Sequence, residues 1–84
     1  RSALASYVKL YSQRYAKVGI RMNSILPGYI DSYQQDSELI KSIPAGRLGS
    51  VKEVAESVSF LVSDASTYIN GQNISIDGGL SKRL

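Results

Sequence analysis

Apolar residues recur at intervals of three and four near the start of the chain, which is the period of an amphipathic helix. Neither Pro nor Gly occurs between Ser2 and Lys17, while Gly19 stands where a helix commonly ends. Lys17, in the last turn, complements the helix dipole. The pattern therefore predicts a helix over residues 2–17. The residues of its apolar stripe are Leu4, Tyr7, Val8, Tyr11 and Tyr15.

The period changes from helical to alternating directly after this helix. Residues 20–26 alternate in character, and Pro27 with Gly28 closes the run, as is typical of a strand that ends at a loop. Apolar residues occupy both sets of alternating positions, so we expect burial on both faces of the strand. A polar excursion over residues 33–43 follows, and a short helix is one interpretation of residues 37–40.

A second helix is predicted by its start signal. Ser50 and Glu53 have the spacing of a capping box, in which the hydroxyl accepts from an exposed first-turn amide and the carboxylate reaches back. The helix should begin at Val51 and continue to about Ser63, because the apolar residues between them keep the spacing of a core-facing stripe.

The remaining sequence predicts a short turn and a second strand. Asp64 is expected to cap the turn over residues 65–67, and Asn70 with Gly71 supplies a tight turn before a strand over residues 73–76. The order helix, strand, excursion, helix, strand indicates an α/β fold, and a strand-helix-strand unit places its two strands parallel. Two strands alone do not make a stable sheet.

Composition fits one small globular domain and narrows its chemistry. Of the 84 residues, 43% are hydrophobic and 20% are charged, a balance unlike that of a disordered tail. The absence of Cys and His removes disulfides, thiolate metal sites and the commonest general base. The net charge of +3 is dispersed, which argues against a nucleic-acid partner. Without a signal peptide or an apolar run long enough to cross a bilayer, we expect a cytoplasmic protein with no membrane attachment.

Two segments carry a family resemblance: GIRMNSILPGYIDS at residues 19–32 and IPAGRLGSVKEVAESVSFLVSDASTYINGQNISIDGG at residues 43–79. Together they resemble the carboxy-terminal third of a short-chain dehydrogenase/reductase. The resemblance implies that residues 1–84 are the C-terminal part of a single Rossmann-like domain, a doubly wound parallel sheet. The family's glycine-rich dinucleotide loop, catalytic Ser and catalytic Tyr would all precede Arg1. Because the chain also begins with Arg rather than Met, we expect a fragment.

The resemblance places a cofactor-binding loop at Pro27, Gly28, Ile30 and Ser32. In the family, backbone groups after the Pro-Gly pair and a hydroxyl four residues past the Gly hold the nicotinamide carboxamide and ribose. Ile30 would offer the main-chain groups and Ser32 the hydroxyl, with Ser in place of the more usual Thr. On the residues alone, Pro-Gly is also compatible with a plain turn.

The resemblance also gives roles to Arg1, to the first helix and to the excursion. Arg1 falls at the position of the family's catalytic Lys, with a planar guanidinium in place of a compact ammonium. Tyr7, Tyr11 and Tyr15 are interpreted as packing residues, because no Lys has the spacing of the family's Tyr motif, and this helix would belong to the main dimer interface. Residues 33–43 would be the substrate lid.

Two short motifs flank the second helix and strand: Arg-Leu-Gly at residues 47–49 and Asp-Gly-Gly at residues 77–79. Both are interpreted as architectural. Arg47 can pair with a carboxylate or with helix-end carbonyls, and the glycines permit backbone conformations that a Cβ would obstruct. Contact between Arg47 and a substrate is the alternative.

These inferences lead to two hypotheses about function. The first is part of an NAD(P)-dependent oxidoreductase, with NAD or NADP as cofactor, an alcohol or carbonyl compound as substrate, and a homodimer or homotetramer as the assembly. The segment would supply the nicotinamide-side loop, the lid and the oligomer interface, and would be inactive alone without the glycine-rich turn and the Tyr. The second is an inactive fragment that acts as a self-association or interaction module through its apolar helix faces. Cofactor binding distinguishes the two.

Overall fold

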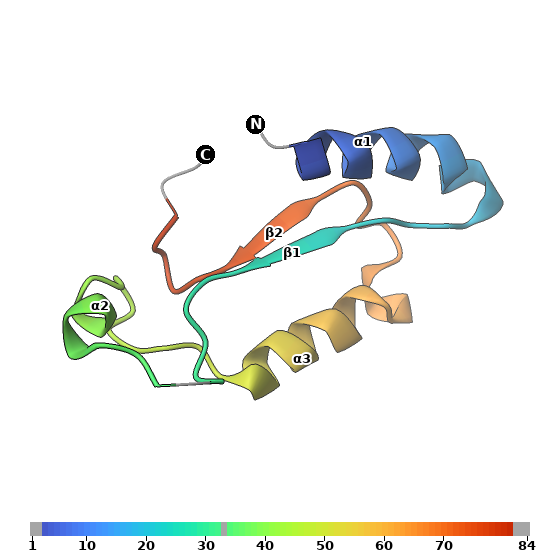
Figure 1. Cartoon of the computed structure of the whole chain (residues 1–84). Helices are drawn as coiled ribbons and strands as arrows, with labels where there is room; N and C mark the ends of the chain where they lie inside the picture. Colours follow the sequence, from blue (N-terminus) through green and yellow to red (C-terminus); the bar gives the residue numbers. More distant parts are fainter. Residues whose placement is uncertain (1–2, 33, 82–84) are drawn as a thin grey trace.

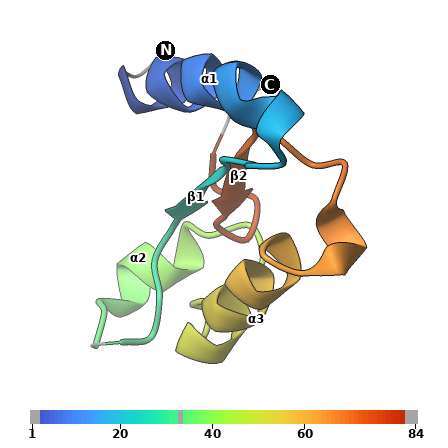
Figure 2. The ribbon, with the colours of Figure 1, turned by 90° about the vertical axis from the view of Figure 1, so that its right-hand side faces the viewer.

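The computed structural model describes residues 3–32 and 34–81. Two strands form a central layer, with one long helix on each face (Figure 1). The view turned by 90° has the same three layers, with α1 above the sheet and α3 below it (Figure 2). This is the predicted α/β arrangement. The elements of these layers are α1 (Ala3–Tyr15), β1 (Ser24–Pro27), α3 (Val51–Leu61) and β2 (Asn73–Ile76).

The two strands pair in parallel, as their order in the chain predicted. Ser24 lies opposite Asn73, and Pro27 lies opposite Ile76. The carboxyl ends of β1 and β2 therefore meet at one edge of the sheet. The loops that leave this edge carry both the Pro-Gly pair and the Asp-Gly-Gly turn.

The ladder is shorter than expected, because β1 begins at Ser24 and not at residue 20. Upstream of Ser24, the Gly71 amide still donates to the Met22 carbonyl at 2.8 Å, and the side chain of Asn70 adds further bonds. Its Oδ1 accepts from the Met22 amide at 3.0 Å, and its Nδ2 donates to the Ser12 carbonyl of α1 at 3.0 Å. Asn70 thus connects the bend before β2 with both the entry to β1 and the last turns of α1.

The first helix ends at Tyr15, slightly before the expected end at Lys17. It passes into a 3-10 turn over Ala16–Val18, and Gly19 has a φ of 83°, in the left-handed region that glycine adopts readily. The predicted first residue of the helix, Ser2, lies outside the described residues. Within residues 3–32 and 34–81, no helix is both long enough and apolar enough to cross a membrane.

The predicted apolar stripe of α1 is only partly buried. Val8 is 3% exposed, whereas Tyr7 is 52% exposed. The tyrosine rings pack along the outside of the helix, with centroids 4.5 Å apart for Tyr7 and Tyr11 and 5.9 Å apart for Tyr11 and Tyr15. The buried line runs through Val8 and Ser12. The two-stranded sheet is narrow and covers only part of the apolar face of α1.

The excursion between β1 and α3 contains α2 (Ser37–Lys41), which confirms the short helix. The Asp36 carboxylate caps it by accepting from the Glu38 amide at 3.3 Å. α2 lies beyond the carboxyl ends of the two strands (Figure 1). Ile43, directly after it, is 4% exposed, so the excursion returns to the body of the molecule through a buried side chain.

The second long helix begins with the predicted capping box. Ser50 Oγ accepts from the Glu53 amide at 3.0 Å, and Glu53 Oε1 accepts from the Ser50 amide at 2.9 Å. The helix ends at Leu61, slightly before the expected end near Ser63. Helix ends commonly fray into tighter turns, and here the Ser63 amide donates to the Phe60 carbonyl at 3.1 Å.

The cap of the next turn was predicted one residue too late. The 3-10 turn spans Asp64–Ser66, and its cap is Ser63, whose Oγ accepts from the Ala65 amide at 3.1 Å. Asp64 is the first residue of the turn itself, so its carboxylate is too far along to cap it. Ser and Asp are both good caps and stand side by side here, which is why the sequence pattern alone favoured the wrong one.

Arg21 joins the segment before β1 to the end of α3. Its guanidinium donates to the carbonyls of Ser66 at 2.7 Å, Ile69 at 3.1 Å and Ser63 at 3.3 Å. Carbonyls beyond a helix end have no partner within the helix, and Arg21 supplies one. The sequence pattern assigned Arg21 no structural role.

Candidate functional site

The candidate site is the loop over residues 28–32, which follows the carboxyl end of β1 (Figure 1). Open α/β sheets bind ligands at this edge. Among the residues predicted to bind cofactor, Pro27 is the last residue of β1 and is exposed, and Ser32 is exposed at the end of the loop. Arg1, the residue at the catalytic Lys position, lies outside the described residues.

Gly28 brings the ends of the two strands together. Its amide donates to the Ile76 carbonyl at 2.9 Å. A Cβ at this position would lie 2.7 Å from the Cβ of Asp77 and 2.9 Å from its Cα, closer than such atoms approach one another. The glycine therefore has a packing reason in addition to its place in the predicted cofactor loop.

Ile30 is fixed by its neighbours in a single parallel bridge to Gly49. The Gly49 amide donates to the Tyr29 carbonyl at 3.0 Å, and the Asp31 amide donates to the Gly49 carbonyl at 2.9 Å. Because these bonds flank Ile30, its own amide and carbonyl point away from Gly49. The Ile30 side chain covers Gly49, where a Cβ would lie 3.0 Å from Ile30 Cδ1.

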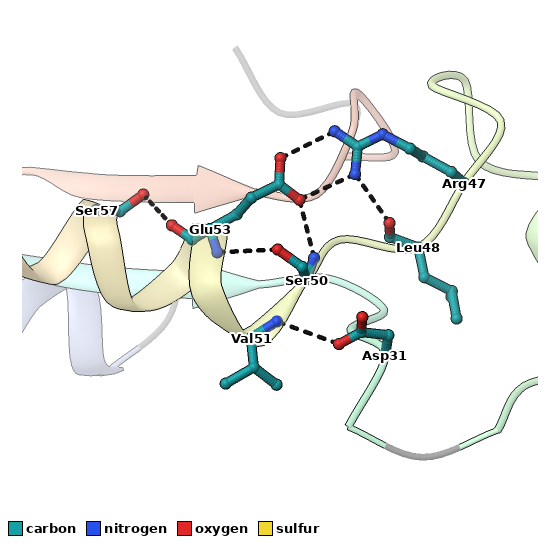
Figure 3. Close-up of polar contacts among 7 residues, drawn as sticks. All are labelled: Asp31, Arg47, Leu48, Ser50, Val51, Glu53 and Ser57. Atoms are coloured by element: carbon teal, nitrogen blue, oxygen red, sulfur yellow. Dashed lines mark hydrogen bonds and ion pairs between the residues drawn. The ribbon is translucent and has the colours of Figure 1, made fainter.

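Asp31 is a site residue that the sequence analysis missed. Its Oδ1 accepts from the amide of Val51, the first residue of α3, at 3.1 Å (Figure 3). The loop after β1 is therefore held by a side chain to the start of the next long helix. No local spacing signals such a cap, since the two residues are 20 positions apart.

The start of α3 carries a paired charge network (Figure 3). Arg47 donates from its two terminal nitrogens to the two carboxylate oxygens of Glu53, each at 2.9 Å, and from one of them to the Leu48 carbonyl at 3.0 Å. Hydrogen bonds from Arg47, with a further one from the Ser50 amide, lower the pKa of Glu53 to about 2. The same pair raises the pKa of Arg47. The predicted pairing of Arg47 with a carboxylate is confirmed.

The Asp-Gly-Gly turn closes the same edge of the sheet. Gly78 and Gly79 have φ values of 64° and 90°, which confirms the need for glycine here. Asp77 Oδ1 accepts from the Gly79 amide at 3.0 Å, and the Gly78 carbonyl accepts from the Ala45 amide at 3.0 Å. The turn thereby anchors the end of the excursion beside Ile43.

A shallow cleft of about 230 Å³ lies between the loop after β1, the Asp-Gly-Gly turn and the start of α3. Arg47 and Glu53 are among its lining residues, and both are committed to each other. Arg47 thus acts as part of the wall. Its contact with a substrate, the alternative interpretation, stays a prediction.

A loop at the carboxyl end of a parallel strand, beside a capped helix start, is characteristic of the ligand-binding edge of Rossmann-like folds. The family model described as "Enoyl-(Acyl carrier protein) reductase" matches residues 1–81. The chain belongs to the short-chain dehydrogenase/reductase family, and its fold is part of a Rossmann-like sheet, as predicted.

Three similar proteins illustrate the match. The 3-oxoacyl-[acyl-carrier-protein] reductase FabG of Chlamydia trachomatis serovar D is 36% identical over 88 residues, covering 96% of this chain and 36% of that protein. A short chain dehydrogenase from Bacillus anthracis has a TM-score of 0.85 and 33% identity, covering 96% of this chain and 35% of its own. YwfH, an NADPH dependent reductase involved in bacilysin biosynthesis, has a TM-score of 0.87 and 31% identity, covering 98% and 38%. The chain therefore spans little more than a third of each of these proteins.

Proposed function

We propose that this chain is the nicotinamide-side part of an NAD(P)-dependent oxidoreductase that acts on an alcohol or carbonyl compound. The observation that carries the proposal is the geometry at Ile30. Its flanking bonds to Gly49 leave its own amide and carbonyl directed away from the helix start, as groups that bind a carboxamide must be. A carboxamide has one acceptor oxygen and a donor nitrogen, which complement a main-chain amide and carbonyl.

The other residues of the loop would complete the cofactor contact. Ser32, exposed two positions beyond Ile30, offers a hydroxyl to the nicotinamide ribose. Pro27 and Gly28 fix the direction in which the loop leaves β1. A nicotinamide held there would supply hydride exchange with a substrate carbon, and the residues of this chain would orient it. Residues 33–43, including α2, would cover the substrate.

The proposed oxidoreductase needs parts beyond this segment. Pyrophosphate binding in such folds uses a glycine-rich turn at a helix start, and proton transfer uses the family's Tyr. Neither motif occurs in these 84 residues, so we expect the segment to be inactive alone. We also propose that the complete protein is a homodimer or homotetramer, and the exposed Tyr7 and Leu10 on α1 support that part.

A second candidate function is an interaction module with no catalytic role. Several large apolar side chains at the end of α3 are exposed, among them Phe60 at 47% and Val62 at 76%. Exposed apolar surface of this kind favours association with another chain or another copy. Cofactor binding separates this candidate from the first.

The test is a fluorescence titration with NADPH and NADH. We would titrate the 84-residue chain and a hybrid reductase, defined as YwfH with its matching 38% replaced by residues 1–84. The hybrid is expected to bind NADPH saturably, because it restores the glycine-rich part. Saturable binding by the 84-residue chain itself would exclude the interaction-only candidate. A folded hybrid that leaves the fluorescence of both cofactors unchanged would overturn the oxidoreductase proposal.

Ser32→Ala in the hybrid tests the loop directly. Loss of one ribose hydrogen bond should weaken NADPH binding about five- to tenfold. Ser59→Ala is the matched control, because Ser59 is an exposed serine on α3 away from the loop, and it should bind as the unmodified hybrid does. Equal affinities for the two variants would remove Ser32 from the proposed site.

A further inference from the structure

The loop after β1 and the start of α3 are joined by three hydrogen bonds. Two are between main-chain groups, from Gly49 to Tyr29 and from Asp31 to Gly49. The third is the bond from the Val51 amide to the Asp31 side chain. Asp31 therefore holds the helix start with both its main chain and its carboxylate, and it is the only side chain that takes part in these three bonds.

The carboxylate of Asp31 meets a group that needs a partner. The first amides of a helix have no acceptor within the helix. In α3, the Glu53 amide is capped by Ser50, while the Val51 amide is left for Asp31. A negative charge at this end also interacts favourably with the helix dipole. The contact is thus a cap contributed from outside the helix.

The helix start is itself firmly set, and this makes it a useful reference for the loop. The Glu53 carboxylate holds the Ser50 amide, and Arg47 holds both oxygens of that carboxylate (Figure 3). A loop tied to such a network takes its position from the helix start. Asp31 stands between the two proposed nicotinamide contacts, Ile30 and Ser32, so its placement sets theirs.

We infer that Asp31 is a positioning residue of the nicotinamide loop, which it fixes to the first amide of α3. The inference deepens the proposed function and rests on it. Asp31 does not touch the nicotinamide in this assignment. It restrains Ile30 and Ser32 so that their donors and acceptors are in place before the cofactor arrives, which lowers the ordering cost of binding.

The first measurement is amide hydrogen exchange, by NMR, on the full chain and on the hybrid reductase. Asp31→Ala removes the acceptor of the Val51 amide, and exchange at that amide should become about five- to tenfold faster. Asp31→Asn keeps an oxygen at the Oδ1 position and should stay close to the unmodified protein. Asp64→Ala, an exposed acid in the 3-10 turn after α3, is the control. Unchanged exchange at Val51 in Asp31→Ala would overturn the inference.

The second measurement is NADPH affinity in the hybrid. Asp31→Ala should raise the dissociation constant for NADPH about five- to tenfold, and Asp31→Asn should keep it close to that of the unmodified hybrid. Faster exchange with unchanged affinity would overturn the positioning role. If the unmodified hybrid binds no NADPH, the proposed function fails and the positioning role fails with it, whereas faster exchange at Val51 would still establish the cap itself.

Discussion

At the scale of single residues, the contacts that matter most join positions far apart in the chain. Arg21 reaches carbonyls that lie 42 to 48 positions later. A guanidinium can satisfy several acceptors at once because its donors form a rigid fork, which an ammonium does not have. We therefore expect Arg21 to be the side chain whose loss most weakens the connection between β1 and the end of α3.

Arg21→Met tests this expectation. Three carbonyls would lose a charged donor, and the free energy of unfolding should fall by about 2 kcal/mol. Arg21→Lys keeps the charge and should recover part of the loss. Urea unfolding followed by circular dichroism measures both, with Lys17→Met, an exposed cation beyond α1, expected to change stability by less than about 0.5 kcal/mol. Equal free energies of unfolding for Arg21→Met and Lys17→Met would show that the Arg21 hydrogen bonds do not stabilise this connection.

At the scale of elements, the start of α3 links structure to pH. The pKa of Glu53 is lowered from 4.5 to about 2 by Arg47 and Ser50. A depressed acid stabilises the fold above its unfolded pKa and loses that contribution as pH falls through its folded pKa. The contribution of Glu53 should therefore be complete above about pH 4.5 and be lost on acidification toward about pH 2.

Melting temperatures measured from about pH 6 down to about pH 2 test this dependence. Glu53→Gln and Arg47→Met should each flatten the acid limb of the wild-type curve, because each removes one partner of the pair. The Arg47 side chain is 62% exposed and that of Glu53 is 43% exposed, so added salt should shrink the difference in melting temperature between wild type and variants. Parallel acid limbs for the wild type and Glu53→Gln would show that the pair does not govern this range.

The same helix shows how far sequence reasoning extends. The capping box at Ser50 and the helix end at Gly19 were predictable, because both are local signals within a few residues. Asp31 and Asn70 were not, because their partners are 20 to 58 positions away and only the folded chain brings them together. The family resemblance located the loop that contains Asp31, but it assigned roles only to Pro27, Gly28, Ile30 and Ser32, and these roles stay predictions.

At the scale of the whole molecule, the chain exposes more surface than a compact domain of its mass. Its accessible surface is 6338 Å², whereas a folded monomer of 9.1 kDa exposes about 4,900 Å². Its radius of gyration is 14.7 Å, against about 12 Å for a compact chain of this length. The excess reflects a two-stranded sheet between two long helices, whose outer faces remain uncovered (Figure 2). Association should therefore be favourable.

We expect α1 to carry this association. On its exposed side, Leu10 is 57% exposed and Tyr7, whose ring packs at a tilt against that of Tyr11, is 52% exposed. A charge at the centre of an apolar interface cannot be desolvated cheaply, so Leu10→Lys should weaken self-association roughly tenfold in sedimentation equilibrium. Val62→Lys is the matched control, since Val62 is 76% exposed beyond the end of α3, across the sheet from α1. If Val62→Lys weakens association and Leu10→Lys does not, the end of α3 is the interface. The rings of Tyr7, Tyr11 and Tyr15 then pack only on one another.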